Sequence, residues 1–288
     1  MLPHSGKRSR TWKEISQLGA ALEDREPASP PPGDVAIVFD WENRWALTQP
    51  DLPADIDYQA EVFAWYEALH ARHVQVSFVR TEADLSGFRL VVAPVLYLLT
   101  EDGAVSLERF VETGGTLVTT AFTDIVDEHD RFRLGGYGTQ LGEVLGGRPV
   151  DFFGVLPEEG RVARASGADF AVTTMIEDFD LDGGDVLART REGEPVLIRN
   201  RFGAGTSFHL ACFTDKAGTG FVLDRALEAA AVTPVVDGLD PAVEAVATVH
   251  GVTLINQSAD PVKVKTENDA FTLAPFEVRH VSRDRLHQ

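Results

Sequence analysis

The stretch DVAIVFDWEN, residues 34–43, gives the clearest indication of how this chain folds. Residues 34–39 form an apolar run of strand length, which is typical of a strand that is buried on both faces. Such a strand belongs in a sheet that has helices packed on each side. The stretch therefore predicts an α/β domain that begins near residue 34.

Strands and helices alternate four times around this stretch. Residues 55–71 and 107–111 carry apolar positions at helical spacing, while residues 74–79, 88–93 and 116–120 have the composition of strands. This alternation predicts a parallel sheet with helices on both faces. The fold class is therefore α/β, of the Rossmann or flavodoxin-like type, and it resembles class I amidotransferase-like folds.

The pattern changes after about residue 150. Short apolar runs in residues 160–210, broken by Gly and charged turns, predict an antiparallel extension of the sheet, and residues 218–231 predict another helix. From about residue 240 every segment is short and β-like. We expect an α/β domain over residues 33–232 and a small antiparallel β domain over residues 233–288, which leans on the first because of its size.

The first 32 residues form a separate region. Residues 9–22 place Trp12, Ile15, Leu18 and Leu22 on one face of a predicted helix. A lone helix of this length is marginal in water, so its apolar face implies a partner surface. The Pro-rich stretch that follows, up to residue 32, predicts a linker.

Composition excludes several classes of partner. The net charge is −19, and 33 of the 45 acidic residues lie in residues 33–232, so a nucleic acid would be repelled. No apolar run is long enough to span a bilayer, and no secretory signal follows Met1. Cys212 is the sole cysteine, which excludes an internal disulfide and fits a reducing cytoplasm.

Two acidic stretches invite a metal and are each better explained otherwise. Residues 178–183 match the start of a calcium loop, but Arg189 stands where a bidentate Glu is required, so an acidic turn is favoured. Residues 124–130 hold four carboxylates and His129, yet no second His or Glu follows at helical spacing. We predict a solvated or salt-bridged loop there, and neither a metal nor a cofactor for the chain.

Two further motifs also have a structural explanation. An amidotransferase nucleophile would sit on a sharp turn after a strand, whereas Cys212 lies inside a strand-like run, which predicts a buried thiol. The Gly203-Ala204-Gly205 stretch joins two strand-like runs and opens no helix. It therefore predicts a hairpin turn and not a phosphate loop.

The best candidate patch is formed by Trp41, Glu42, Asn43, Arg44 and Trp45, directly after the first strand. In open α/β sheets the carboxyl ends of the strands carry the ligand-binding crevice. These side chains are of the types that stack on and hydrogen-bond a sugar, or that anchor a subunit interface. Aromatic packing beneath a loop is the third interpretation, and the sequence leaves all three open.

Several motifs together resemble the glycoside hydrolase family 42 β-galactosidases, in matching order. They are DVAIVFDWEN (34–43), DLSGFRLVVAP (84–94), GGTLV (114–118), VDEHD (126–130) and LGGY (134–137). The resemblance implies that residues 33–232 are the trimerisation domain and that residues 240–282 are the small C-terminal β domain. LPHSG at residues 2–6 resembles the end of the catalytic barrel, so both catalytic glutamates of the family precede Met1 and no residue here is carried over as catalytic.

The resemblance implies a non-catalytic trimerisation portion of a β-galactosidase in carbohydrate metabolism, located in the cytoplasm, with a homotrimer of this chain as its assembly. One alternative is an active β-galactosidase whose barrel comes from a separate chain. The other is a galactoside-binding module that uses Trp41 and Trp45.

Overall fold

The computed structural model describes residues 8–23, 33–265 and 270–282. Much of the predicted barrel remnant and linker, residues 1–7 and 24–32, lies outside the described residues. The predicted N-terminal helix is confirmed as α1 (Arg10–Leu22), and its N-cap Ser9 accepts a hydrogen bond from the backbone N–H of Trp12. No described side chain of α1 is buried, and Ile15 and Leu18 are exposed.

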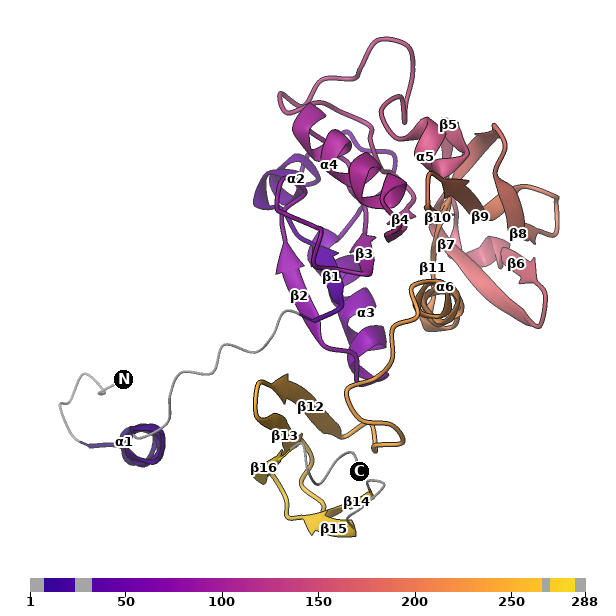
Figure 1. The fold of residues 1–288 in the computed structure, drawn as a ribbon. Coiled ribbons are helices and arrows are strands. Elements are labelled where there is room, and N and C mark those ends of the chain that lie inside the picture. The colour runs from indigo at the N-terminus through magenta and orange to yellow at the C-terminus, as the bar shows by residue number, and fades with distance from the viewer. Residues whose placement is uncertain (1–7, 24–32, 266–269, 283–288) are drawn as a thin grey trace.

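One large sheet of 11 strands organises the described part of the chain (Figure 1). Its first half is parallel, in the order β2-β1-β3-β4-β10, and the α/β prediction is confirmed. The strands are β1 (Val35–Val38), β2 (Val76–Val79), β3 (Leu90–Ala93), β4 (Thr116–Thr120) and β10 (Gly205–Leu210).

Helices cover both faces of the parallel half, as the fully apolar strands require. The side chains of Val35 and Ile37 pack in a core with α3 (Tyr58–His70) and α6 (Lys216–Ala229). The alternate residues Ala36 and Val38 pack in a second core with α4 (Glu101–Glu112) and α5 (Gly142–Leu145). The strand at residues 35–38 is therefore buried on both faces, as predicted.

The other half of the sheet is antiparallel and continues in the order β9-β8-β6-β7-β11, with β5 also paired to β7. The predicted extension is confirmed. Its strands are β5 (Gly147–Gly154), β6 (Val162–Ala165), β7 (Ala168–Leu181), β8 (Asp185–Thr190), β9 (Pro195–Phe202) and β11 (Cys212–Thr214), with a 3₁₀ turn at η1 (Pro157–Glu159).

The turn between β9 and β10 is the predicted hairpin. Gly203 has φ of +56°, and a Cβ atom at this position would lie 2.5 Å from the carbonyl oxygen of Glu112. Glycine thus fits a left-handed turn that is pressed against the end of α4. The hairpin therefore packs the antiparallel half of the sheet against α4, which covers one face of the parallel half.

The C-terminal residues form small antiparallel sheets with their own core, which includes Val243, Leu254 and Leu273. This unit contacts the large domain, since the side chain of Gln75 accepts from the N–H of Ala247 at 2.8 Å. The division at residue 232 stays a prediction. The strands are β12 (Val243–Thr248), β13 (Gly251–Asn256), β14 (Val262–Lys265), β15 (Ala270–Leu273) and β16 (Val278–Ser282).

One carboxyl group on α3 gives the fold a pH dependence. Burial, with a smaller contribution from Asp57, raises the pKa of Glu61 from 4.5 to about 7. The folded state then holds a proton that the unfolded state releases, so stability falls as the pH rises from about 4.5 to 7.

We expect Glu61→Gln to raise the free energy of unfolding at pH 8 by about 1–3 kcal/mol and to change it little at pH 4.5. Urea unfolding at the two pH values measures the difference. Glu67→Gln on the same helix is the matched control. An effect of Glu61→Gln that is the same at both pH values would contradict the assignment.

Candidate functional site

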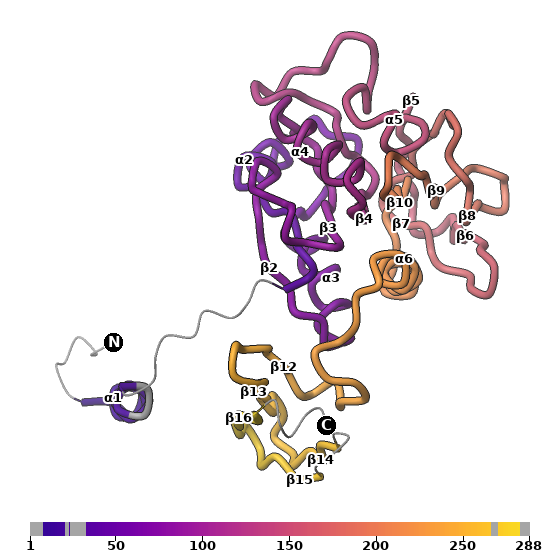
Figure 2. The backbone as a smooth tube through the Cα atoms, in the orientation of Figure 1, coloured from indigo at the N-terminus to yellow at the C-terminus, as the bar shows by residue number. Residues whose placement is uncertain are grey.

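The connections that follow β1, β3 and β4 meet at one edge of the sheet, because these three strands are parallel. They are α2 (Trp41–Ala46), residues 94–100 and residues 121–141. In Figure 1 the connections lie together beyond the ends of these strands, and Figure 2 shows the backbone of the longest one arching between β4 and α5. This is the edge where open α/β sheets place their binding sites.

The predicted aromatic patch lies on α2. The carboxyl of Asp40 caps the helix by accepting from the N–H of Glu42 at 2.7 Å. Trp41 and Trp45 are four residues apart, so they share a helix face. Their side chains are 53% and 60% exposed. The ring of Trp41 packs edge-to-face against the ring of Phe39, with centroids 5.1 Å apart.

Asn43 differs from the rest of the patch because it is completely buried. Its side-chain amide donates to the carbonyl of Val95 at 2.9 Å and accepts from the N–H of Leu98 at 2.8 Å. Val95 has φ of +45°, an unusual value for a β-branched residue. Asn43 therefore fixes α2 to the irregular segment after β3 and contributes nothing to the exposed surface.

Arg44 and Glu42 complete the patch. The Nε of Arg44 donates to the side chain of Gln59 at 2.8 Å, and the guanidinium lies 5.6 Å from the ring of Trp41. Arg44 borders a cleft of about 500 Å³, but neither Trp41 nor Trp45 lines that cleft. The structure thus places the two tryptophans on one exposed helix face and outside this cleft.

The loop at residues 121–141 is anchored from beneath by a buried polar network. Glu177 on β7 accepts from the N–H of Phe122 at 2.7 Å, and its other oxygen lies 2.7 Å from Nε2 of His209 on β10. The Nδ1 of that ring lies 2.8 Å from the hydroxyl of Thr119 on β4. All three network side chains are buried. They hold Phe122 at φ of +68°, where the loop turns away from the strand.

The acidic cluster at residues 124–130 serves the backbone of the same loop. Asp124 is buried, which raises the pKa of its carboxyl, and it accepts from the N–H groups of Gln140 and Leu141. Asp127 accepts from the N–H groups of His129 and Arg131. Across the described residues we find no grouping of His, Cys, Asp and Glu that is able to hold a metal.

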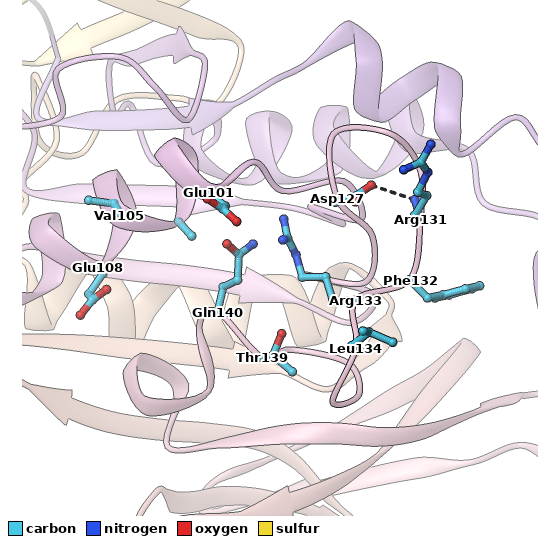
Figure 3. Close-up of a pocket in the computed structure, with 11 residues that line it drawn as sticks. Glu101, Val105, Glu108, Asp127, Arg131, Phe132, Arg133, Leu134, Thr139 and Gln140 are labelled. Carbon is cyan, nitrogen blue, oxygen red and sulfur yellow. Dashed lines mark hydrogen bonds between the residues drawn. The ribbon is translucent and has the colours of Figure 1, made fainter.

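Apolar side chains stand out at the tip of the loop. Phe132 is 64% exposed and Leu134 is fully exposed, and both border a hollow of about 710 Å³ with Val105 of α4, which is 61% exposed. Figure 3 shows these residues around the hollow, next to the hydrogen bond from Arg131 to Asp127. A hydrogen bond from Gln49 to Asp130 joins the loop to the chain that follows α2.

The remaining sequence candidates lie on strands and not in these connections. Cys212 is buried as predicted, and burial, with Glu177 adding to it, raises the pKa of its thiol. Asp178 and Asp180 are exposed on one face of β7. Sequence reasoning missed the Glu177 network, whose members are far apart in the chain, and it also missed Phe132 and Leu134. The sequence did offer a sign of Phe132 and Leu134, because two large apolar residues inside a polar loop are unusual.

Among the described segments, no helix has the length and apolar character needed to cross a lipid bilayer.

Comparison with known proteins gives a consistent result. The family model of the β-galactosidase trimerisation domain matches residues 33–233. β-Galactosidase BgaA of a Planococcus species is 34% identical over 252 residues, which cover 82% of this chain and 37% of BgaA. BgaB of a Geobacillus species is 32% identical over 245 residues, which cover 82% of this chain and 36% of BgaB. The chain thus spans about a third of the length of these curated relatives.

Solved structures agree over almost the whole chain. The β-galactosidase from Bacillus circulans sp. alkalophilus superposes with a TM-score of 0.86 at 28% identity, covering 96% of this chain and 46% of that one. A catalytic mutant of Gan42B, a GH42 β-galactosidase from G. stearothermophilus, gives a TM-score of 0.84 at 25% identity, covering 96% of this chain and 44% of that one.

Proposed function

Because the chain belongs to the β-galactosidase trimerisation domains of glycoside hydrolase family 42, we propose that it holds three copies of itself together. The observation that carries this proposal is the match of the family model over residues 33–233. The exposed apolar side chains at the sheet edge support it, because exposed apolar patches mark protein association sites.

The proposed role is structural and not catalytic. The described residues form an open sheet, and no closed (β/α)₈ barrel is evident among them. The relatives are named as β-galactosidases, so we propose that the trimer of this chain is part of a larger assembly that acts on terminal β-galactosides in carbohydrate metabolism. The reaction would be carried out by a barrel domain that the described residues do not contain. We assign no catalytic residue to this chain. The lone buried Cys212 supports a cytoplasmic location.

We also propose a finer fold assignment and a domain division. The parallel order β2-β1-β3-β4-β10 supports a flavodoxin-like half-sheet, in which the same order runs 2-1-3-4-5. Separate apolar cores support one domain over residues 33–232 and a second over residues 233–288.

Light scattering coupled to size-exclusion chromatography tests the proposed assembly. We expect a mass of about 94 kDa, three times the 31.4 kDa of the single chain. The matched reference is the same protein in denaturant, which reports the single-chain mass. A native peak near 31 kDa at micromolar concentration would overturn the proposal.

A further inference from the structure

We propose that the trimer contact is made at the carboxyl edge of the parallel strands, where α2 of one copy packs against the 121–141 loop of the next. We call Trp41 and Trp45 the helix half of this surface, and Val105, Phe132 and Leu134 the loop half. The occupant of each half is thus a second copy of this chain. This inference rests on the proposed trimeric function and specifies which residues perform it.

Symmetry requires two different surfaces. In a ring of three identical subunits each contact is heterologous, so one patch of a copy meets a different patch of its neighbour. The described edge offers such a pair, because the helix half follows β1 and the loop half is built on β4 and α4. The hydrogen bond between Gln49 and Asp130 joins the chain that follows α2 to the loop that carries Phe132 and Leu134.

The exposed area is sufficient for the apolar centre of an interface. The five side chains are between 53% and 101% exposed. Since an aromatic side chain presents about 150–250 Å², together they expose on the order of 700 Å². One contact uses the helix half of one copy and the loop half of the next, so this area is somewhat under half of the roughly 1,600 Å² that a standard interface buries in total. The five side chains would therefore form the apolar centre of the contact, and polar groups around them would supply the rest.

The residue types match those of interface centres. Trp and Phe are enriched at such centres, and Trp and Arg are frequent among the residues that dominate binding. Here the apolar groups are the two tryptophans and Phe132. Arg44 lies 5.6 Å from the ring of Trp41, and the exposed Arg131 precedes Phe132 in the chain, so each half has an arginine next to it. The acidic surface elsewhere would disfavour contact between two copies, since the net charge is −19.

Both halves are held rigid before any contact. Asn43 fixes the helix half through two buried hydrogen bonds. Asp124 and Glu177 fix the loop through backbone N–H groups at its two bends. Preordered groups lose little conformational freedom on association, which favours binding.

Two single variants and their mixture test the proposal. Trp45→Asp disables the helix half and Leu134→Asp disables the loop half, and both sites are exposed, so folding should change little. We expect each variant to run near 31 kDa, with the concentration for half-assembly raised at least about tenfold. Leu156→Asp, at a leucine that is 58% exposed elsewhere, is the matched control and should stay trimeric.

The mixture distinguishes a heterologous contact from other arrangements. A Trp45→Asp copy keeps its loop half and a Leu134→Asp copy keeps its helix half, so one intact contact forms between them. We expect a heterodimer of about 63 kDa in native mass spectrometry, twice the single-chain mass. Circular dichroism checks that both variants are folded.

Trimeric variants would overturn the proposal and leave the edge to another occupant, such as a catalytic barrel. Monomeric variants whose mixture also stays monomeric would overturn the pairing of the two halves. A monomeric wild-type chain would instead refute the proposed function itself, so the two failures are distinguishable.

Discussion

Replacing Glu177 with alanine is expected to lower the free energy of unfolding by about 2–6 kcal/mol, because two buried polar groups each lose a hydrogen-bond partner at a cost of about 1–3 kcal/mol. The carboxyl satisfies the N–H of Phe122 and lies 2.7 Å from Nε2 of His209. Both groups are inaccessible to water in the folded chain, so alanine leaves them without a partner and opens a cavity. Equilibrium unfolding in urea measures the loss.

Glu177→Gln is the matched control for this variant. Its amide oxygen is able to accept from Phe122, and its amide nitrogen is able to donate to His209 if the ring carries its proton on Nδ1, facing Thr119. We therefore expect a loss of only about 1 kcal/mol. Equal losses for the alanine and glutamine variants would show that the hydrogen-bond network is not the source of the stability.

Asn43→Ala is the second variant with a large expected effect. It removes the amide that binds the carbonyl of Val95 and the N–H of Leu98, both in the segment after β3, and leaves these two buried groups without that partner. Each buried polar group left unsatisfied costs about 1–3 kcal/mol. The same change frees the helix half, so we expect the trimer to weaken as well as the fold.

Thermal unfolding and light scattering follow the two effects of Asn43→Ala. Gln59→Ala, which removes the partner of Arg44 at the exposed side of α2, is the control and should change stability by less than about 0.5 kcal/mol. If Asn43→Ala unfolds at the wild-type temperature, the amide is not the anchor of α2.

Local pattern was sufficient to predict most of the architecture. Both faces of β1 are covered, so residues 35–38 are all apolar. An unbroken apolar run is visible in the sequence, and burial on both faces was therefore predictable. The hairpin at Gly203 was predictable because its turn chemistry is local. The apolar run from Phe208 to Phe213 predicted one strand, but the structure divides it at Ala211 into β10 and β11. β10 pairs with β9, whereas β11 pairs with β7, and nothing in the sequence indicated this change of partner.

The site was predictable only in part, for a related reason. The spacing of Trp41 and Trp45 indicated a shared face, and the structure places them on one. The burial of Asn43 depends on a segment more than 50 residues away, and Glu177, His209 and Thr119 come from three different strands. Contacts of this kind are set by the topology of the sheet and leave no periodic signal in the sequence.

Sedimentation equilibrium of the wild-type chain is the decisive test of trimer formation, because it reports mass without reference to shape. Over a series of micromolar concentrations we expect a species of about 94 kDa, which on dilution dissociates toward the 31.4 kDa chain. A mass of 31.4 kDa across the whole series would contradict it.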